Sequence, residues 1–204
     1  MSRQTEIILR WIGSLPEGAL IRSRDLEHLA NRTQASRELT GLAKAGRLMR
    51  VARGMYVAVT ACRFGPVPPP VDKVVQSLAQ ITGHAIVRHG AAAANALGLT
   101  TQVPVRQIFL TDGPAQMLYL GKQVIEVRRV PGWMLVLGDN LAGDVIRALE
   151  WLGPDPTKQS IIKLAERIGR DEWLAMLGVQ HQLPEWLATV IGQAAYSTDV
   201  PFCP

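Results

Sequence analysis

Cysteine and aromatic residues are scarce in this 204-residue chain, and each scarcity excludes a class of protein. Two cysteines are too few for a disulfide framework or a cysteine-rich metal cluster. An aromatic content of 5% argues against the stacking platforms that bind single-stranded nucleic acids. No apolar run reaches the roughly 18–20 residues that a membrane span needs, and the start, MSRQTEIILRW, lacks the apolar core of a signal peptide. We therefore expect a cytoplasmic protein with no membrane partner.

Basic residues, in contrast, are concentrated at one end of the chain. Residues 1–63 contain ten arginines and one lysine against five acidic residues, a net charge of +6, whereas residues 64–204 have a net charge of −1. Such a basic segment is typical of nucleic-acid binding. The planar guanidinium of arginine suits bidentate contacts with phosphate and guanine. A solvated basic face without a partner is the alternative that composition leaves open.

Residues 1–63 predict a winged helix-turn-helix domain. Apolar residues at spacings of three and four, preceded by capping residues, predict three helices, and two β-prone runs around a glycine turn predict a hairpin. The turn between the second and third helices is only two or three residues long, as this motif requires. The first two expected helices are 5–12 and 24–30, the latter capped by Ser23. The third is capped by Thr33 and ends near Gly46. The expected strands are 48–51 and 55–59.

A proline-rich linker is predicted at 64–70, followed by an α+β domain at 71–204. Three consecutive prolines favour a stiff extended segment, and the charge balance changes at the same place. Beyond the linker we expect a mixed domain with strands first and helices last. The expected strands are 105–110 and 123–130, with turns at 112–114 and 120–122 between them; the expected helices are 71–82, 90–97, 141–152, 158–169, 170–177 and 184–194.

The third helix is predicted to read DNA. With Leu39 and Leu42 facing the core, its polar side chains fall on other faces. They lie near the helix N-terminus, which is the part of a recognition helix that enters the major groove. Arg37 is expected to bond a guanine, Gln34 an adenine, and Arg32 a phosphate. An ordinary amphipathic surface helix is the alternative. The other predicted contacts on this helix are Thr33, Ser36, Thr40 and Lys44.

The hairpin is the second predicted contact. Arg47, Arg50 and Arg53 place three guanidinium groups within seven residues, and Gly54 allows a sharp turn. A wing that reaches an adjacent groove or the DNA backbone uses such groups. The alternative is a solubilising β-edge, since exposed edges commonly carry cations. Met55 and Tyr56 are expected to pack back against the three helices.

Catalytic and metal-binding patterns are absent or weak. The sequence has no phosphate loop and no HExxH, GxSxG or GxGxxG motif. His84 and His89 have no carboxylate cluster nearby, so a helix-cap or surface role is favoured over a metal site. We therefore expect no enzyme activity, no metal and no cofactor. An enzyme with a diffuse active site, acting on a partner, is an alternative that nothing in the residues requires.

The pattern Leu39-x-x-Leu42-x-x-x-Gly46-x-Leu48-x-Arg50-x-x-Arg53-Gly54-x-Tyr56 resembles the winged-helix end of AbiEi-type antitoxins. These proteins are the antitoxin and repressor components of type IV (abortive-infection-type) toxin–antitoxin operons. The segment 90–104, GAAAANALGLTTQVP, is similar to the start of their C-terminal domain, and Gly121-Lys122 with RRVP at 128–131 continues the similarity. The resemblance covers roughly residues 5–135.

This resemblance implies an autorepressor whose N-terminal domain binds inverted operator repeats on double-stranded DNA, with a dimer on the DNA. Its C-terminal domain would counteract a nucleotidyltransferase-like toxin, without a direct complex being required. The 113–121 segment, with Ala115, Gln116 and Met117, is less basic than this family leads us to expect. A stand-alone repressor, or a module that docks an acidic protein, are the competing hypotheses.

Overall fold

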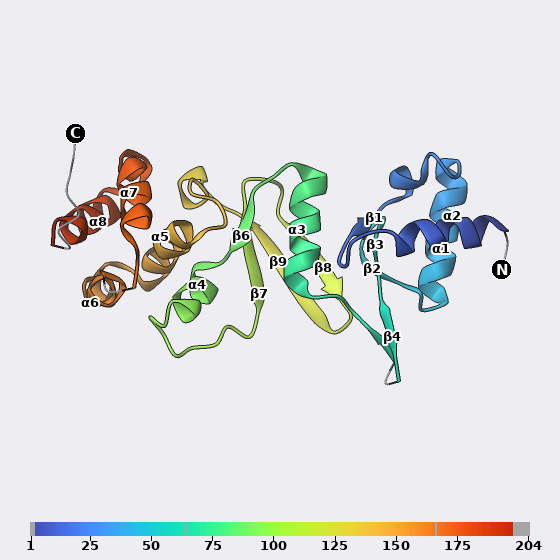
Figure 1. Ribbon diagram of the computed structural model, residues 1–204, viewed down its shortest axis with the longest axis horizontal. Coiled ribbons are helices and arrows are strands. Elements are labelled where there is room, and N and C mark those ends of the chain that lie inside the picture. Colours follow the sequence, from blue (N-terminus) through green and yellow to red (C-terminus); the bar gives the residue numbers. More distant parts are fainter. Residues whose placement is uncertain (1–2, 64, 166, 198–204) are drawn as a thin grey trace. The chain divides into compact units, whose positions relative to one another are not determined.

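The computed structural model describes residues 3–63, 65–165 and 167–197, and shows an α+β protein (Figure 1). The chain folds into two compact units that are not consecutive in sequence. The first unit combines the residues up to His84 with Gln116–Glu126, and the second combines Ala85–Ala115 with the residues from Val127 onward. The sequence placed the division at 64–70, so the units divide the chain elsewhere. Residues 64 and 198–204, which belong to the predicted linker and second domain, lie outside the described residues.

The first unit begins with two helices packed on a small antiparallel sheet. The sheet has the order β1-β3-β2, with Leu20 opposite Val57 and Arg50 opposite Tyr56. The helices bury apolar residues spaced three or four apart, such as Ile8 and Ile12. The elements are α1 (Arg3–Gly13), β1 (Leu20–Ile21), the 3-10 helix η1 (Ser23–Leu26), α2 (Arg32–Lys44), β2 (Leu48–Ala52) and β3 (Met55–Ala58).

The predicted second helix, 24–30 with Ser23 as cap, is wrong. Only the short 3-10 helix η1 forms there, and the residue that caps it is Arg22. Asp25 closes this turn, because its carboxylate accepts from the Arg22 backbone N–H at 2.8 Å and pairs with the Arg22 guanidinium at 2.8 Å. Asn31 already caps the next helix. Leu26 is the one fully buried residue of this interval, so it offers no apolar stripe to stabilise a regular α-helix.

The predicted linker forms part of a second hairpin. β4 (Thr60–Cys62) pairs antiparallel with β5 (Gly65–Val67), and Pro66 lies opposite Ala61. Proline and the residue before it favour extended backbone, which is compatible with a short edge strand. Pro70 then caps the next helix, α3 (Val71–Thr82), whose bounds are those expected from the sequence.

Helix α3 packs within the first unit. The Leu20 backbone N–H donates to Ser77 Oγ at 2.9 Å, and Glu17 pairs with Lys73. Gly18, with φ of +82°, allows the closest approach, because a Cβ there would lie 2.5 Å from the Lys73 Cβ. These contacts explain why the first unit extends to His84 rather than ending at the prolines.

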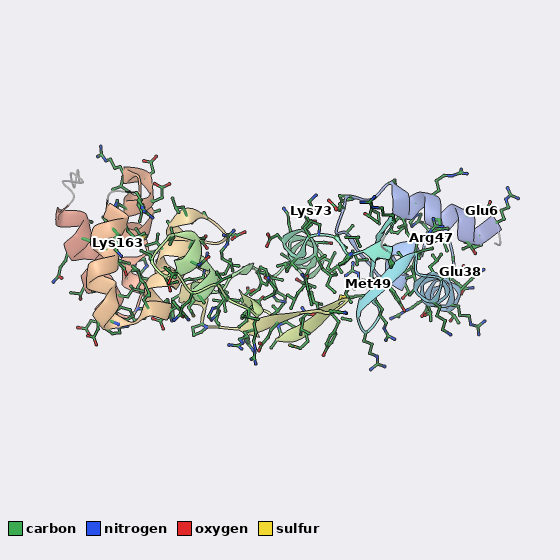
Figure 2. All side chains as sticks on the ribbon, turned by 90° about the horizontal axis from the view of Figure 1, so that it is seen from below. Glu6, Glu38, Arg47, Met49, Lys73 and Lys163 are labelled. Carbon is green, nitrogen blue, oxygen red and sulfur yellow. The ribbon has the colours of Figure 1, made fainter. Side chains whose placement is uncertain are left out.

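The strand β8 (Gln116–Leu120) and the first half of β9 (Gln123–Arg129) return to the first unit. Helix α3 lies across one face of these strands (Figures 1 and 2). Leu118, Leu120 and Ile125 are buried, whereas Met117 and Tyr119 alternate with them and are exposed. The sequence predicted turns at both ends of this segment but not strand β8 between them.

The second unit is largely helical. It contains β6 (Ile86–Arg88) and β7 (Gln107–Thr111), which pair antiparallel, and they belong to a four-stranded sheet of order β6-β7-β9-β8. Helices come both before and after these strands, so the expected order of strands first is too simple. The helices are α4 (Gly90–Ala96), η2 (Gly132–Met134), α5 (Leu141–Leu152), α6 (Pro154–Ala165), α7 (Arg170–Gly178), η3 (Gln180–Gln182) and α8 (Glu185–Ser197).

Two contacts around α5 organise this unit. A Cβ on Gly90 would lie 2.2 Å from the Arg147 carbonyl oxygen, so glycine lets α4 cross α5 closely. The Arg147 side chain is completely buried; it pairs with Asp144 at 2.8 Å and donates to the Gly138 carbonyl at 3.0 Å. Apolar residues from α5 to α8, including Trp173, complete the core. Among the described residues, no helix is both long enough and apolar enough to cross a membrane.

Candidate nucleic-acid interface

Helix α2 begins with a side-chain cap. The Asn31 side chain accepts from the Gln34 backbone N–H at 2.9 Å, and the Ala35 N–H donates to the Asn31 carbonyl at 2.8 Å. Asn31 is therefore the N-cap, and the prediction of Thr33 in this role is wrong. Thr33 is instead the second residue of the helix, where its exposed side chain is available to a ligand.

The predicted division of α2 into two faces is confirmed. Ala35, Leu39 and Leu42 are buried in the core of the first unit, and Ala43 is partly buried. Every polar residue predicted to contact DNA on this helix is exposed: Arg32, Thr33, Gln34, Ser36, Arg37, Thr40 and Lys44. Helix periodicity alone explains this result, since residues off the buried stripe face solvent.

The one carboxylate on α2 is turned toward α1. Glu38 is half-buried, and its Oε2 accepts a hydrogen bond from the Thr5 hydroxyl at 2.9 Å. It is the only acidic residue between Glu27 and Asp72 in the sequence. The exposed surface of α2 and of the following hairpin is consequently cationic and carries little opposing charge.

The end of α2 sets the direction of the chain into the hairpin. Gly46 has φ of +70° and its N–H donates to the Ala43 carbonyl at 3.1 Å, while the Arg47 N–H donates to the Leu42 carbonyl at 3.0 Å. This pair of bonds is a Schellman motif, which satisfies the last helical carbonyls and requires a left-handed residue. Arg47, exposed immediately after the motif, is thereby held beside the start of β2 (Figure 2).

The hairpin β2–β3 carries the other two predicted arginines. Arg50 and Arg53 are exposed, and Gly54 occupies the turn with φ of +72°. The pairing of β2 with β3 shifts register between Arg50 and Ala52, a local irregularity that ends the regular ladder before the turn. The Arg50 Nε donates to the Ala52 carbonyl at 3.4 Å, so the terminal nitrogens of its guanidinium extend beyond the strand.

A hydrogen bond that the sequence did not predict joins the helix to the hairpin. Thr40 Oγ1 lies 3.2 Å from the Tyr56 hydroxyl and 2.8 Å from the Ser36 carbonyl. The Tyr56 ring is buried against the helices, as expected, and its hydroxyl reaches the exposed surface of α2. Thr40 therefore connects the two candidate DNA-binding elements. Its partner lies 16 residues away, and no local pattern reveals such a contact.

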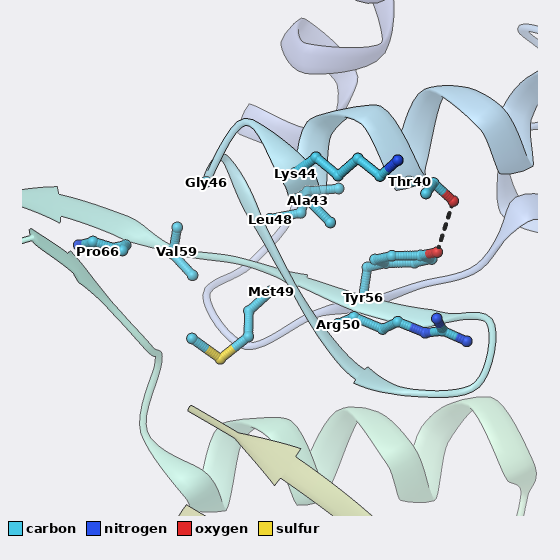
Figure 3. A pocket seen from close by; sticks show the side chains of 10 residues that line it. All are labelled: Thr40, Ala43, Lys44, Gly46, Leu48, Met49, Arg50, Tyr56, Val59 and Pro66. Atoms are coloured by element: carbon cyan, nitrogen blue, oxygen red, sulfur yellow. Dashed lines mark hydrogen bonds between the residues drawn. The ribbon is translucent and has the colours of Figure 1, made fainter. Parts of the chain in front are cut away.

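These elements enclose a groove of about 510 Å³ between the end of α2 and the two hairpins of the first unit (Figure 3). The Lys44 ammonium, the Thr40–Tyr56 pair and the Arg50 guanidinium extend toward one side of it. Apolar side chains occupy the other side. Its complete lining is Thr40, Ala43, Lys44, Gly46, Leu48, Met49, Arg50, Tyr56, Val59 and Pro66.

Histidines serve local structure where the contacts are described. His89 caps α4, since its Nδ1 accepts from the Ala91 N–H at 3.1 Å. A helix-cap role was one of the two roles that the sequence favoured for this residue. His28 lies edge-on to Trp11, with ring centroids 5.7 Å apart. Within the described ranges, no three histidine, cysteine, aspartate or glutamate side chains are grouped as metal ligands would be.

Comparison with known proteins identifies a family whose function is unknown. The model of a "Family of unknown function (DUF6088)" matches residues 7–175, which include the helix, the hairpin and the groove described above. No curated protein and no solved structure matches the chain. Because the match spans more than half of the sequence, the chain belongs to the DUF6088 family.

Proposed function

We propose that this protein binds double-stranded DNA through α2 and the hairpin β2–β3 in the manner of a winged helix-turn-helix, with the 3-10 helix η1 in the place of the helix that precedes the turn. One observation carries the proposal: all ten residues predicted from the sequence are exposed on these adjoining elements, while the nearby carboxylate of Glu38 bonds to α1. Six of the ten are cations, and a concentration of cations with few acids favours the phosphate backbone. The six are Arg32, Arg37, Lys44, Arg47, Arg50 and Arg53.

The geometry of α2 supports a division of roles. Its 13 residues span about 20 Å, a length that fits along the major groove. Gln34 and Arg37 are three residues apart and therefore adjacent on one helix face, in the first two turns. These two side chains suit base edges, because glutamine pairs with adenine and arginine with guanine. Arg32 and the hairpin arginines would contact phosphates, as would Lys44.

We further propose a role as autorepressor and antitoxin of a type IV toxin–antitoxin operon, in the cytoplasm. The sequence resemblance to AbiEi-type antitoxins supports this part. The protein would bind inverted operator repeats as a dimer, since one winged helix offers a small interface and two half-sites strengthen binding. The second unit would counteract a nucleotidyltransferase-like toxin.

Fluorescence anisotropy with two duplexes tests the DNA-binding proposal. One duplex carries the DNA upstream of the protein's own gene, and the other is a scrambled sequence of equal length. Arg37→Ala should weaken binding to the upstream duplex by about 1–3 kcal/mol and reduce the preference between the two. Arg53→Ala should weaken binding to both duplexes equally if it contacts only phosphate. Arg170→Ala, an exposed arginine on α7, is the matched control and should change neither.

Two results would contradict the proposal. Absence of duplex binding by the wild-type protein at low salt would remove DNA as the ligand, and capture of an acidic protein instead would favour a protein-docking module. Equal effects of Arg37→Ala and Arg53→Ala on every sequence would refute the division of roles.

Co-expression tests the antitoxin role separately. The neighbouring open reading frame is expressed with and without this protein, and growth is measured. Rescue by the wild-type protein and by Arg37→Ala alike would support an antitoxin activity that does not depend on DNA reading. Toxicity that persists with the wild-type protein, or a neighbouring gene product that is not toxic, would refute the antitoxin role and leave only the proposed repressor.

A further inference from the structure

The groove between α2 and the hairpin combines positive charge with apolar walls. Lys44 from the last turn of α2 and Arg50 from β2 both line it, and their charged groups extend toward the same side (Figure 3). We propose that this groove holds a single backbone phosphate of the bound DNA, contacted by the Lys44 ammonium and the Arg50 guanidinium together. This inference rests on the proposed DNA binding and adds a shared phosphate site to it.

The hydroxyl groups in the groove are already engaged, which assigns the phosphate to the two cations. Thr40 Oγ1 lies 2.8 Å from the Ser36 carbonyl, an acceptor, so the Thr40 proton is donated there. The Tyr56 hydroxyl, 3.2 Å from Thr40 Oγ1, then donates its own proton to Thr40. Neither hydroxyl retains a proton for a phosphate oxygen. The pair instead fixes β3 against α2, and with it the positions of the two cations.

The rest of the lining favours a phosphodiester with its sugar over a bare ion. Leu48, Met49 and Val59 line the groove with apolar surface, Met49 and Val59 on the side away from the charged groups (Figure 3), and the volume of about 510 Å³ exceeds what one anion fills. Apolar walls lower the local dielectric constant, which strengthens the attraction between the phosphate and each cation. The Arg50 Nε is bonded to Ala52, and the two terminal nitrogens remain as a fork for phosphate oxygens.

The dependence of affinity on salt distinguishes one shared phosphate from two separate ones. Binding of a short synthetic duplex is measured over about 50–200 mM salt for the wild-type protein, Lys44→Met, Arg50→Met and the double variant. Methionine keeps the length of the side chain and removes its charge. Lys163→Met, a substitution of an exposed lysine on α6, is the control for the loss of one positive charge, as in each single variant. Thermal denaturation confirms that each variant is folded.

Each phosphate neutralised contributes about −0.9 to the slope of log K against log salt. One shared phosphate predicts that the double variant loses about 0.9 of slope in total, while Lys163→Met keeps the wild-type slope. A loss of about 1.8 would mean that each cation contacts its own phosphate and would overturn the inference. If the wild-type protein binds DNA and the double variant keeps the same slope, the groove lies outside the interface, which also overturns the inference. Failure of the wild-type protein to bind any duplex would instead refute the proposed function itself.

Discussion

Replacing Gly18 with alanine should destabilise the first unit more than the same substitution at Gly46. Both glycines have left-handed backbone, with φ of +82° and +70°. They differ in their surroundings: a Cβ at Gly46 would meet nothing within 4 Å, whereas one at Gly18 would lie 2.5 Å from the Lys73 Cβ and 3.1 Å from the Val74 backbone nitrogen. The comparison therefore separates backbone strain from the close approach of α3.

The two losses can be estimated from these surroundings. Left-handed backbone costs a residue with a Cβ about 1–2 kcal/mol, which is the whole expected loss for Gly46→Ala. At Gly18 the new methyl group meets the backbone and Cβ of a helix rather than the end of a flexible side chain. Overpacking of this kind adds about 1–3 kcal/mol. Gly18→Ala should therefore lower the free energy of unfolding by about 2–5 kcal/mol.

Urea unfolding followed by circular dichroism measures both variants beside the wild-type protein. A greater loss for Gly18→Ala supports the packing of α3 against the loop before β1. Equal losses for the two variants would refute that packing, and with it the extension of the first unit to His84. A truncation at residue 70 would then be the better description of the N-terminal domain.

Three further predictions concern stability. Asn31→Ala should lower the free energy of unfolding by about 1 kcal/mol, because it removes the cap of α2, whereas Thr33→Ala should change it little; urea unfolding compares them. Arg147→Met should lower the melting temperature by removing the buried partner of the Asp144 carboxylate, at a cost below the about 3–5 kcal/mol of an uncompensated buried charge, because Arg88 also pairs with Asp144 at 3.6 Å. Burial raises the pKa of Glu150, so the folded state favours its protonated form, and stability is lost as pH rises through that pKa. Melting temperatures across pH should therefore show that Glu150→Gln gains stability at neutral pH relative to acidic pH.

The exposure of the candidate contact residues on α2 could be predicted because helix periodicity is a local property. Once Leu39 and Leu42 are assigned to the core, the exposure of Arg37 and the other polar residues follows. The cap of α2 could not be chosen in the same way, since Asn31 and Thr33 both favour that position. The structure decides between them through the bond from the Ala35 N–H to the Asn31 carbonyl.

Strand β8 was missed because its two faces look alike in the sequence. Met117, Leu118, Tyr119 and Leu120 alternate between exposed and buried, yet all four are apolar. The period of two that indicates a half-buried strand is therefore invisible in their hydropathy. The Thr40–Tyr56 bond was missed for another reason, because it joins residues that only the folded chain brings together.

The prolines that predict a spacer have other roles in the structure. Pro66 lies in β5, and Pro70 is the N-cap of α3. Both uses exploit the fixed backbone angle of proline, which suits an edge strand and a helix start as well as an extended rod. Composition alone cannot separate these three uses, since each requires knowledge of what packs beside the proline.

The interrupted first unit has a consequence for biosynthesis. Its last segment, Gln116–Glu126, is translated only after the 31 intervening residues Ala85–Ala115. A nascent chain that has emerged from the ribosome as far as α3 therefore presents the apolar surface that Leu118, Leu120 and Ile125 later cover. We therefore expect the first unit to complete its core only after Glu126 has been synthesised.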